Sequence, residues 1–277
     1  MAQEHRPSEA APNEGGDRRR PSLSALELVA NHTLDLSTVA LLWLALERHS
    51  SLLVVAGPRL AGKTTVLEAV FDLVSPLYQT AATRGHGEDF SILQGTDPPR
   101  TYIKVNEISD HLPRYLWGPP LIALFRELER GYGVVATMHA ESPEEALDQL
   151  RAPPLDLPQA AVARIDLIVV LALLSQGDQQ VRRLVSVNVM PLVTGTESSL
   201  SAEPLVIWDP AHDVLRVFAA MEAWRILEQR LRLPWEEILR QVELRRTFLR
   251  DLASQGLVSS EQVHEAVTGR YLRERPQ

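Results

Sequence analysis

Short apolar runs alternate with amphipathic stretches through the middle of the chain. The run SLLVVAG (51–57) has the length of a buried strand, and GKTTVLEAVFDLV (62–74) follows it with helical spacing. TYIKV (101–105) predicts a second strand, PPLIALFRELERG (119–131) a helix, and YGVVATMHA (132–140) a third strand. Strands that alternate with helices in this way indicate a parallel sheet with helices on both faces.

Helices precede this alternation, and a strand pair follows it. SALELVA (24–30) predicts a helix, and Ser37 is the expected N-cap of a second helix that continues through TVALLWLALERH. Farther along, SPEE (142–145) combines an N-cap serine, a proline at the first helical position and a capping-box glutamate. ARIDLIVVLALL (163–174) and QVRRLVSVNVM (180–190) predict two strands that pair around the turn between them.

The C-terminal part has a different pattern. PLVIWDPAHDVLRVF (204–218) predicts a hairpin that turns at Asp209-Pro210, and two or three helices follow it. One helix is expected to begin at Pro234, to end at Gly256, and to direct one apolar stripe inward: Ile238, Leu239, Val242, Leu249 and Leu252. The last helix is expected to be capped by Ser259 with Gln262.

These patterns divide the chain into three parts. Residues 1–22 are rich in Pro, Gly, Glu and Arg without periodicity, which is typical of a disordered tail. Residues 23–200 form the expected α/β core, and residues 201–277 a smaller hairpin and helical subdomain. The 277 residues are sufficient for one large buried core.

Composition narrows the classes of partner and chemistry. A net charge of −8 argues against nucleic acid as the main partner, because binding to a phosphate backbone requires a basic surface. The absence of cysteine excludes disulfides, thiol catalysis and cysteine-ligated metals. No secretory signal is visible, and the longest apolar run, IDLIVVLALL (165–174), is about half of what a helix needs to cross a bilayer. We expect a cytoplasmic protein that reaches the inner face of a membrane only through partners.

A glycine-bounded loop carries the clearest chemical signal. Residues 57–64 fit the pattern G-x-x-x-x-G-K-[ST], between an apolar strand and an amphipathic helix. Such a loop directs backbone N–H groups at phosphate oxygens, while its lysine reaches the β- and γ-phosphates and its hydroxyl reaches Mg²⁺. The predicted nucleotide-binding residues are Gly57, Pro58, Arg59, Leu60, Ala61, Gly62, Lys63, Thr64 and Thr65.

Two later strands end in residues suited to act on a bound nucleotide. Asn106 and Glu107 follow the second strand, and His139 follows the third. Hydrolysis of a triphosphate needs a group that positions or deprotonates water, and parallel strands bring such groups to one edge. Taken singly, Glu107 is more often a surface acid at a strand end, and His139 more often a structural or solvent-facing histidine. We expect them together to form the catalytic pair, with Thr64 and Glu107 as the Mg²⁺ ligands.

At these residues the sequence resembles the motor ATPases of type II and type IV secretion, type IV pili and the archaeal flagellum, most closely the archaeal-type branch. The resemblance spans residues 23 to about 195 and 240–272. YIKVNEISD (102–110) stands where the family's Walker B strand ends, and GYGVVATMHAESPEEALDQL (131–150) looks like its His box. The lead-in at 27–70, the hairpin at 164–190 and the closing helices at 244–271 are similar as well.

The resemblance implies a fold, a cofactor and an assembly. It implies a RecA-like P-loop NTPase with a central, mainly parallel sheet that binds ATP and Mg²⁺ and forms a hexameric ring. Lys63 and Thr64 would bind phosphate and Mg²⁺, Glu107 would be the Walker B acid, and His139 would couple nucleotide state to movement. The family's partner would be a secretion or pilus platform protein of the inner membrane.

The chain departs from the family pattern in three ways. The family's separate N-terminal domain is missing, so a second polypeptide is expected to replace it. Asn106 and Ser109 stand where the Walker B segment has glycine and arginine. The span from Lys63 to Glu107 is short. In the family this span holds an acidic Asp box and arginines that reach a neighbouring subunit. The candidate stand-ins here are Arg84, Glu88, Asp89 and Arg100, and the alternative for each is an ordinary residue of a polar loop.

Three functions are compatible with these observations. The first is a motor-type ATPase that hydrolyses ATP and drives export or filament assembly. The second is a regulatory or structural subunit that binds nucleotide but hydrolyses little, which the shortened span favours. The third is a P-loop enzyme of another class, such as a small-molecule kinase, which the His box and the closing helices disfavour.

Overall fold

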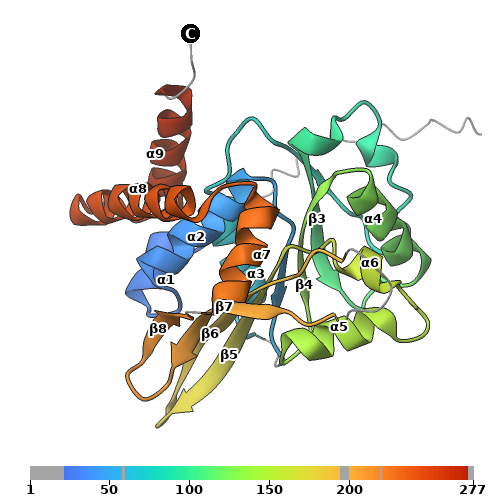
Figure 1. Cartoon of the computed structure of the whole chain (residues 1–277), viewed down its shortest axis with the longest axis horizontal. Coiled ribbons are helices and arrows are strands. Elements are labelled where there is room, and N and C mark those ends of the chain that lie inside the picture. The colour runs from blue at the N-terminus through green and yellow to red at the C-terminus, as the bar shows by residue number, and fades with distance from the viewer. Residues whose placement is uncertain (1–21, 58–59, 194–199, 219, 274–277) are drawn as a thin grey trace, which may run out of the picture.

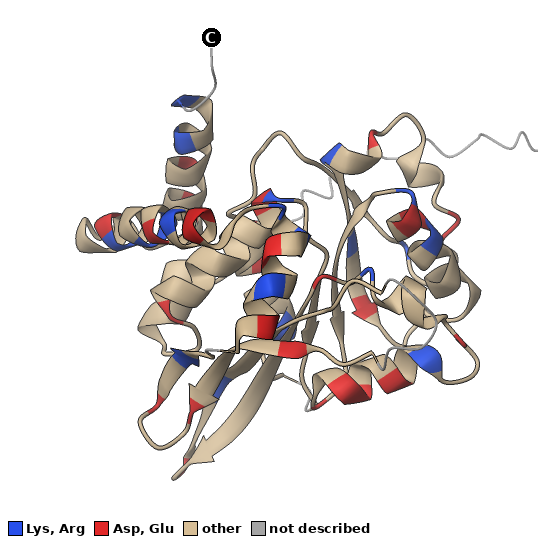
Figure 2. Ribbon diagram, viewed as in Figure 1, with Lys and Arg blue, Asp and Glu red and all other residues tan. Residues whose placement is uncertain are grey.

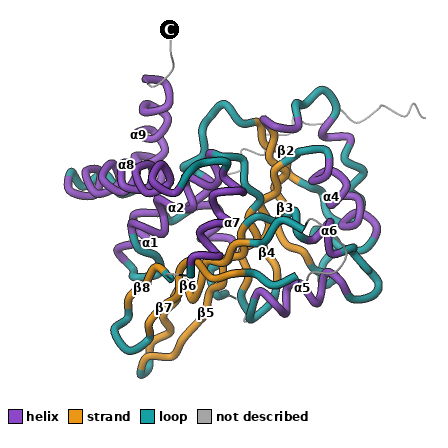
Figure 3. The backbone as a smooth tube through the Cα atoms, in the orientation of Figure 1, coloured by secondary structure: helices purple, strands orange, loops and turns teal. Residues whose placement is uncertain are grey.

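The computed structural model describes residues 22–57, 60–193, 200–218 and 220–273. The tail predicted over residues 1–22 therefore lies outside the described residues except for Ser22. Within the described part, an eight-stranded sheet runs through the molecule in the order β2-β3-β4-β1-β5-β6-β7-β8 (Figure 3). The predicted α/β fold class, a central and mainly parallel sheet flanked by helices, is confirmed.

The parallel half of the sheet holds the phosphate-loop strand at its centre. Strands β2 to β4 lie on one side of β1 and β5 on the other, and all pair in parallel. Their bounds are β1 Leu52–Val55, β2 Gln79–Ala82, β3 Thr101–Ile108, β4 Gly133–Met138 and β5 Leu167–Gln176. Parallel pairing brings the carboxyl ends of β1, β3 and β4 to the same edge, which is where the candidate residues follow.

The other half of the sheet is antiparallel. Both predicted hairpins are present, and both belong to this one sheet: β6 pairs with β5, β7 with β6, and β8 with β7. Their bounds are β6 Gln179–Val189, β7 Glu203–Asp209 and β8 Val214–Val217. The first hairpin turns at Gly177, whose φ of +60° is a left-handed conformation that glycine adopts without a steric cost.

Helices cover both faces of the sheet. In Figure 1, α4, α5 and α6 lie on one side of the strands, and α1, α2 and α7 lie on the other. The helices are α1 Ala25–Ala30, α2 Leu36–Glu47, α3 Lys63–Phe71, α4 Pro119–Glu129, α5 Pro143–Arg151, α6 Gln159–Val162, α7 Met221–Leu231, α8 Trp235–Ser254 and α9 Ser260–Arg273. Acidic and basic residues are interspersed along α8 (Figure 2), as expected of an exposed helix surface.

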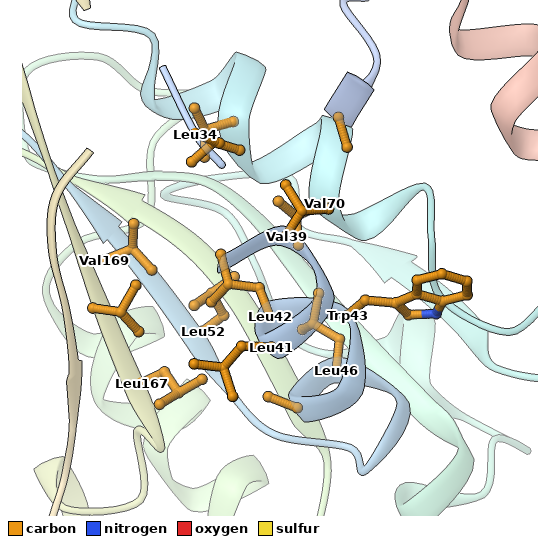
Figure 4. Close-up of a cluster of buried hydrophobic side chains, with 14 of the residues drawn as sticks. Leu34, Val39, Leu41, Leu42, Trp43, Leu46, Leu52, Val70, Leu167 and Val169 are labelled. Atoms are coloured by element: carbon orange, nitrogen blue, oxygen red, sulfur yellow. The ribbon is translucent and has the colours of Figure 1, made fainter. Parts of the chain in front are cut away.

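The two faces of the sheet bury two separate hydrophobic clusters. Leu52 and Val54 of β1 contribute to one cluster, and Leu53 and Val55 to the other, because successive side chains of a strand point to opposite faces. Figure 4 shows α2 on the first face, with Leu41 and Leu42 beside Leu52 and Leu167. A strand that is buried on both faces holds the phosphate loop in a fixed position.

Trp43 links α2 to the C-terminal helices. It is 1% exposed, points away from the sheet (Figure 4), and its Nε1 donates a hydrogen bond to the Tyr271 hydroxyl at 2.7 Å. Its ring lies 5.9 Å from that of Phe248, and the guanidinium of Arg245 stands 5.4 Å from its centroid. The closing helices α8 and α9 are therefore anchored to the lead-in of the phosphate-loop strand.

Local predictions were wrong at three places. Asp35 rather than Ser37 caps α2, because its carboxylate accepts a hydrogen bond from Thr38 N at 2.7 Å and begins the helix earlier. Leu239 is 46% exposed on α8 and does not face inward as predicted. An edge strand, β2, lies within the segment that the sequence presented as a polar loop.

No helix within the described residues combines the length and the apolar character needed to cross a membrane.

Candidate functional site

The predicted phosphate loop joins the end of β1 to the start of α3. Gly62 is the N-cap of α3 with a φ of +92°, and Leu60 has a φ of +65° with 82% of its surface exposed. Pro58 and Arg59, two of the predicted nucleotide-binding residues, lie outside the described residues. The loop therefore turns sharply just before Lys63, which places the N-terminus of α3, whose first N–H groups have no acceptor within the helix, at the edge of the sheet.

Lys63, Glu107 and His139 meet at this edge. The Lys63 ammonium, 7% exposed, lies 3.2 Å from His139 Nδ1 and 3.9 Å from Glu107 Oε1. His139 Nε2 lies 2.7 Å from the same Glu107 oxygen. The structure thus brings together three residues that are distant in the sequence and that the strand-end pattern singled out.

His139 makes polar contacts at both ring nitrogens and at its backbone oxygen. Its Nδ1 lies 3.2 Å from both Lys63 Nζ and Gly57 O. An ammonium can only donate and a carbonyl oxygen can only accept, so Nδ1 can satisfy only one of these two contacts at a time, while Nε2 faces Glu107. Gln149 Nε2 donates to His139 O at 3.0 Å and fixes the backbone of this residue from α5.

Glu107 lies within β3, whereas the sequence analysis placed it after the end of this strand. The pairing of β3 with β4 shifts register between Val105 and Ile108, and this irregularity continues the strand to Ile108. Thr137 Oγ1 donates to Asn106 O at 2.7 Å and joins the two strands at that point. Glu107 is 12% exposed at its side chain, and its buried Oε1 makes no hydrogen bond of acceptable geometry to any described residue.

A cavity of about 830 Å³ opens over the loop and is large enough for a nucleotide. The predicted residues that line it are Leu60, Ala61, Gly62, Lys63, Thr64, Thr65, Glu107 and His139. Gly57 lies beside it, where a Cβ would stand 2.5 Å from Glu141 Cγ, so the close approach of that side chain requires a glycine. The loop and the two strand ends therefore enclose one space.

Several cavity residues were not expected from the sequence. Arg182 of β6 donates from Nε to Leu60 O at 3.0 Å, and His111 and Arg114 enter from the loop after β3. His111 Nδ1 also contacts Ser109 Oγ. None of these three residues belongs to a nucleotide-binding motif. The one sequence feature that could have pointed to Arg182 was the predicted pairing of its strand with the strand before it, which places β6 two strands from β1.

The four expected stand-ins from the shortened span do not line this cavity. Glu88 is fully buried at its side chain, and its two oxygens accept from Arg84 N and Phe90 N, each at 2.7 Å. Hydrogen bonds from Ser91 lower the pKa of Asp89, with Arg84 as a further contact. Arg100 precedes β3, at the opposite end of that strand from Glu107. Glu88 and Asp89 therefore organise their own loop.

The residues present fit a nucleotide-bound divalent cation. The described residues contain no group of three or more His, Asp and Glu that could hold a metal by itself. Mg²⁺ in nucleotide sites instead uses one or two protein oxygens together with phosphates and water. Thr64 and Glu107 both line the cavity, so the Thr64 hydroxyl and the buried Glu107 carboxylate are the two protein oxygen groups that would hold such a cation.

Comparison with known proteins found no matching family model. An uncharacterized protein of Methanocaldococcus jannaschii, MJ1287, is 23% identical over 252 residues, which are 82% of this chain and 90% of that protein. Because that relative is uncharacterized, it assigns no activity.

Three solved structures show lower similarity. The VirB11 ATPase from the Brucella suis type IV secretion system, in complex with sulphate, has 17% identity and a TM-score of 0.37 over 59% of this chain. The Legionella pneumophila ATPase DotB has 14% identity and a TM-score of 0.34 over 80%, and Yersinia pseudotuberculosis DotB has 13% and 0.35 over 87%. This chain spans 53%, 60% and 62% of those three chains, respectively. Values this low leave the function to be argued from the site itself.

Proposed function

We propose that this chain binds ATP with Mg²⁺ in the cavity over the phosphate loop and hydrolyses it as a motor-type ATPase of the secretion and pilus kind. The observation that carries the proposal is the convergence of Lys63, Glu107 and His139 on one cavity. A loop that only turned between a strand and a helix would not require a buried lysine in contact with residues from two other strands.

The loop residues bind and orient the nucleotide. The turn at Gly62 directs the first N–H groups of α3 toward the cavity, and these groups would hold phosphate oxygens. Lys63 is buried against His139 and Glu107, so a phosphate that recruits its ammonium must draw it away from them. Phosphate binding would therefore exchange one set of partners of Lys63 for another.

Glu107 is the proposed Walker B acid. Thr64 and Glu107 would hold Mg²⁺, which would neutralise charge on the phosphates. The Glu107 carboxylate would orient water for attack on the terminal phosphate, because it lines the cavity 3.9 Å from the Lys63 ammonium. His139, at 2.7 Å from Glu107 Oε1, would hold the carboxylate in place.

His139 is the proposed link between the nucleotide and movement. It contacts Lys63, Glu107 and, through its backbone oxygen, Gln149 of α5. A change in the position of Lys63 would thus reach α5 through the side chain and the backbone oxygen of one residue, His139. We propose that subunits assemble as a hexameric ring in the cytoplasm and act on an inner-membrane platform protein.

The test of hydrolysis uses purified protein, Mg²⁺ and ATP. Lys63→Ala is expected to lower turnover by about 10²-fold or more. Glu107→Gln is expected to keep its affinity for ATP within a few-fold and to lower kcat by about 10²–10⁴-fold. Lys104→Ala and Glu144→Gln are matched controls, since Lys104 pairs with Glu68 and Glu144 is exposed in the first turn of α5. Full activity of Glu107→Gln would remove this residue from the mechanism.

The ring is tested separately by the molar mass in solution with a non-hydrolysable ATP analogue and without it. A hexamer with the analogue is expected, and a monomer under both conditions would contradict the ring.

The second candidate function is a nucleotide-binding regulatory subunit with little turnover. It is favoured by one observation: no described residue between Val66 and Glu107 lines the cavity, so the shortened span supplies no second carboxylate that could position water at the nucleotide. Tight ATP binding, with turnover that Glu107→Gln does not lower, would favour this function over the motor.

A further inference from the structure

Arg182 reaches over the phosphate loop from β6, a strand that contributes no residue to the predicted nucleotide site. Its Nε donates to Leu60 O at the tip of the loop, at a distance of 3.0 Å. Its Cδ stands 3.1 Å from where a Cβ on Gly62 would be. The guanidinium therefore borders the cavity beside the backbone that would hold phosphates.

The neighbouring Arg183 differs from Arg182 in whether an acidic side chain pairs with its guanidinium. Arg183 is buried and forms two hydrogen bonds of 2.7 Å with the Asp213 carboxylate, so its charge is compensated within the protein. Arg182 is exposed, and its two terminal nitrogens make no hydrogen bond to any residue that the structure describes. The two terminal nitrogens of the positively charged Arg182 guanidinium can therefore donate hydrogen bonds to a ligand in the cavity.

The position of Arg182 in the sheet indicates which part of a nucleotide it would meet. β1 lies between β4 on one side and β5 and then β6 on the other, so Arg182 and Glu107 flank the loop from opposite sides. In phosphate loops the backbone holds the α- and β-phosphates, and the lysine reaches the β- and γ-phosphates. Since Lys63 points toward Glu107 and His139, the γ-phosphate belongs on their side and the α-phosphate on that of Arg182.

We propose that Arg182 binds the α-phosphate of the nucleotide. Its planar guanidinium matches two phosphate oxygens, while Nε keeps the Leu60 carbonyl and so ties the tip of the loop to the ligand. The proposal rests on the proposed function, because it assumes a nucleotide in this cavity. It adds a binding residue from the β5–β6 hairpin to those of the loop.

The experiment compares four ligands that differ only in phosphate number. Dissociation constants of adenosine, AMP, ADP and ATP are measured for the wild-type chain and for Arg182→Ala, by competition against a fluorescent ADP analogue. Loss of a charged contact with the α-phosphate is expected to raise the dissociation constants of AMP, ADP and ATP by a similar factor of about 10 to 100. The dissociation constant of adenosine is expected to stay unchanged. KM for ATP is expected to rise by that factor, with kcat unchanged within about threefold.

Further variants separate charge from structure. Arg182→Gln removes the charge but keeps an amide donor, and is expected to show the same loss across the three phosphorylated ligands. Arg216→Ala, on β8 with an ion pair to Asp209, is the matched control and is expected to bind all four ligands as the wild type does. Thermal melting is used to confirm that each variant is folded.

The outcomes distinguish this inference from the proposed function. Two results would overturn the proposal that Arg182 contacts the α-phosphate. One is that Arg182→Ala binds all four ligands with wild-type affinity, and the other is that it loses affinity for ADP and ATP but not for AMP. If Lys63→Ala weakens ATP binding and lowers turnover in either case, the proposed function stands and only the role of Arg182 fails. If Lys63→Ala binds ATP as tightly as the wild type, the nucleotide is not in this cavity and both fail.

Discussion

Replacing Arg230 by methionine is expected to destabilise the native state by about 3–5 kcal/mol. Arg230 lies on α7 with a side chain that is 8% exposed. It donates to Asp166 Oδ1 at 3.0 Å, and its other hydrogen bonds go to main-chain oxygens of Ala163, Met190 and Pro191 at 2.6, 2.8 and 2.8 Å. Asp166 in turn accepts from Ser51 N at 2.7 Å, so the pair fixes the start of the phosphate-loop strand.

The expected loss of stability in Arg230→Met comes mainly from the buried carboxylate of Asp166. Methionine fills most of the space but leaves the Asp166 carboxylate buried without its cation, and such an uncompensated charge accounts for most of the loss. Burial raises the pKa of Asp166, and Arg230 partly offsets this shift in the wild type. Without Arg230 the folded-state pKa rises further above the unfolded value, so protonation as the pH falls relieves part of the cost.

Urea unfolding at pH 7 and at pH 5 measures both effects. The difference in free energy of unfolding between the wild type and Arg230→Met is expected to be smaller at pH 5 than at pH 7. The double variant Asp166→Asn/Arg230→Met, which removes the charge, is expected to be more stable at pH 7 than Arg230→Met alone. A loss below about 1 kcal/mol for the single variant, or the same loss at both pH values, would refute the reasoning.

Three further predictions concern other parts of the fold. Gly62→Ala places a side chain at a positive φ against Arg182, so we expect about 1–2 kcal/mol lower stability by urea unfolding and weaker ATP binding; an unchanged affinity would contradict this. Hydrogen bonds from Arg183 lower the pKa of Asp213 to about 2, so the pair stabilises the chain above about pH 4 and this stabilisation is lost toward pH 2. Asp213→Asn is expected to cost about 1 kcal/mol at pH 7 and almost nothing at pH 2 in urea unfolding, and an equal cost at both would be inconsistent with the pair. Tyr102→Phe removes a fully buried hydroxyl that donates to a main-chain oxygen at 2.6 Å, with an expected loss of about 1–2 kcal/mol in thermal or urea unfolding; no loss would contradict that bond.

The sequence was informative where burial and periodicity coincide. Strands such as β1 and β4 are buried on both faces and read as continuous apolar runs, so the alternation and the parallel sheet were predicted correctly. The loop around Lys63 was recognised because its glycines have to satisfy local backbone geometry. The hairpin between β5 and β6 was recognised for the same reason, from the turn at Gly177.

What the sequence did not show depends on contacts between distant segments. β2 is a strand of four residues with largely exposed side chains, and only its pairing with β3 reveals it. The strand end at Glu107 was misplaced because a register shift against β4 extends β3. Arg182 carries no local signal, since it reaches the loop only after β5 and β6 have paired. The roles of Glu107 and His139 stay predictions, although the structure brings both to Lys63.

The most direct measurement is a crystal structure of this chain with Mg²⁺ and a non-hydrolysable ATP analogue. We predict phosphates over the loop at Gly62, with the Lys63 ammonium moved from His139 to the β- and γ-phosphates. We also predict that Glu107 faces the Mg²⁺ and its water. Phosphates bound elsewhere, or Glu107 and His139 directed away from the γ-phosphate, would contradict the central claim.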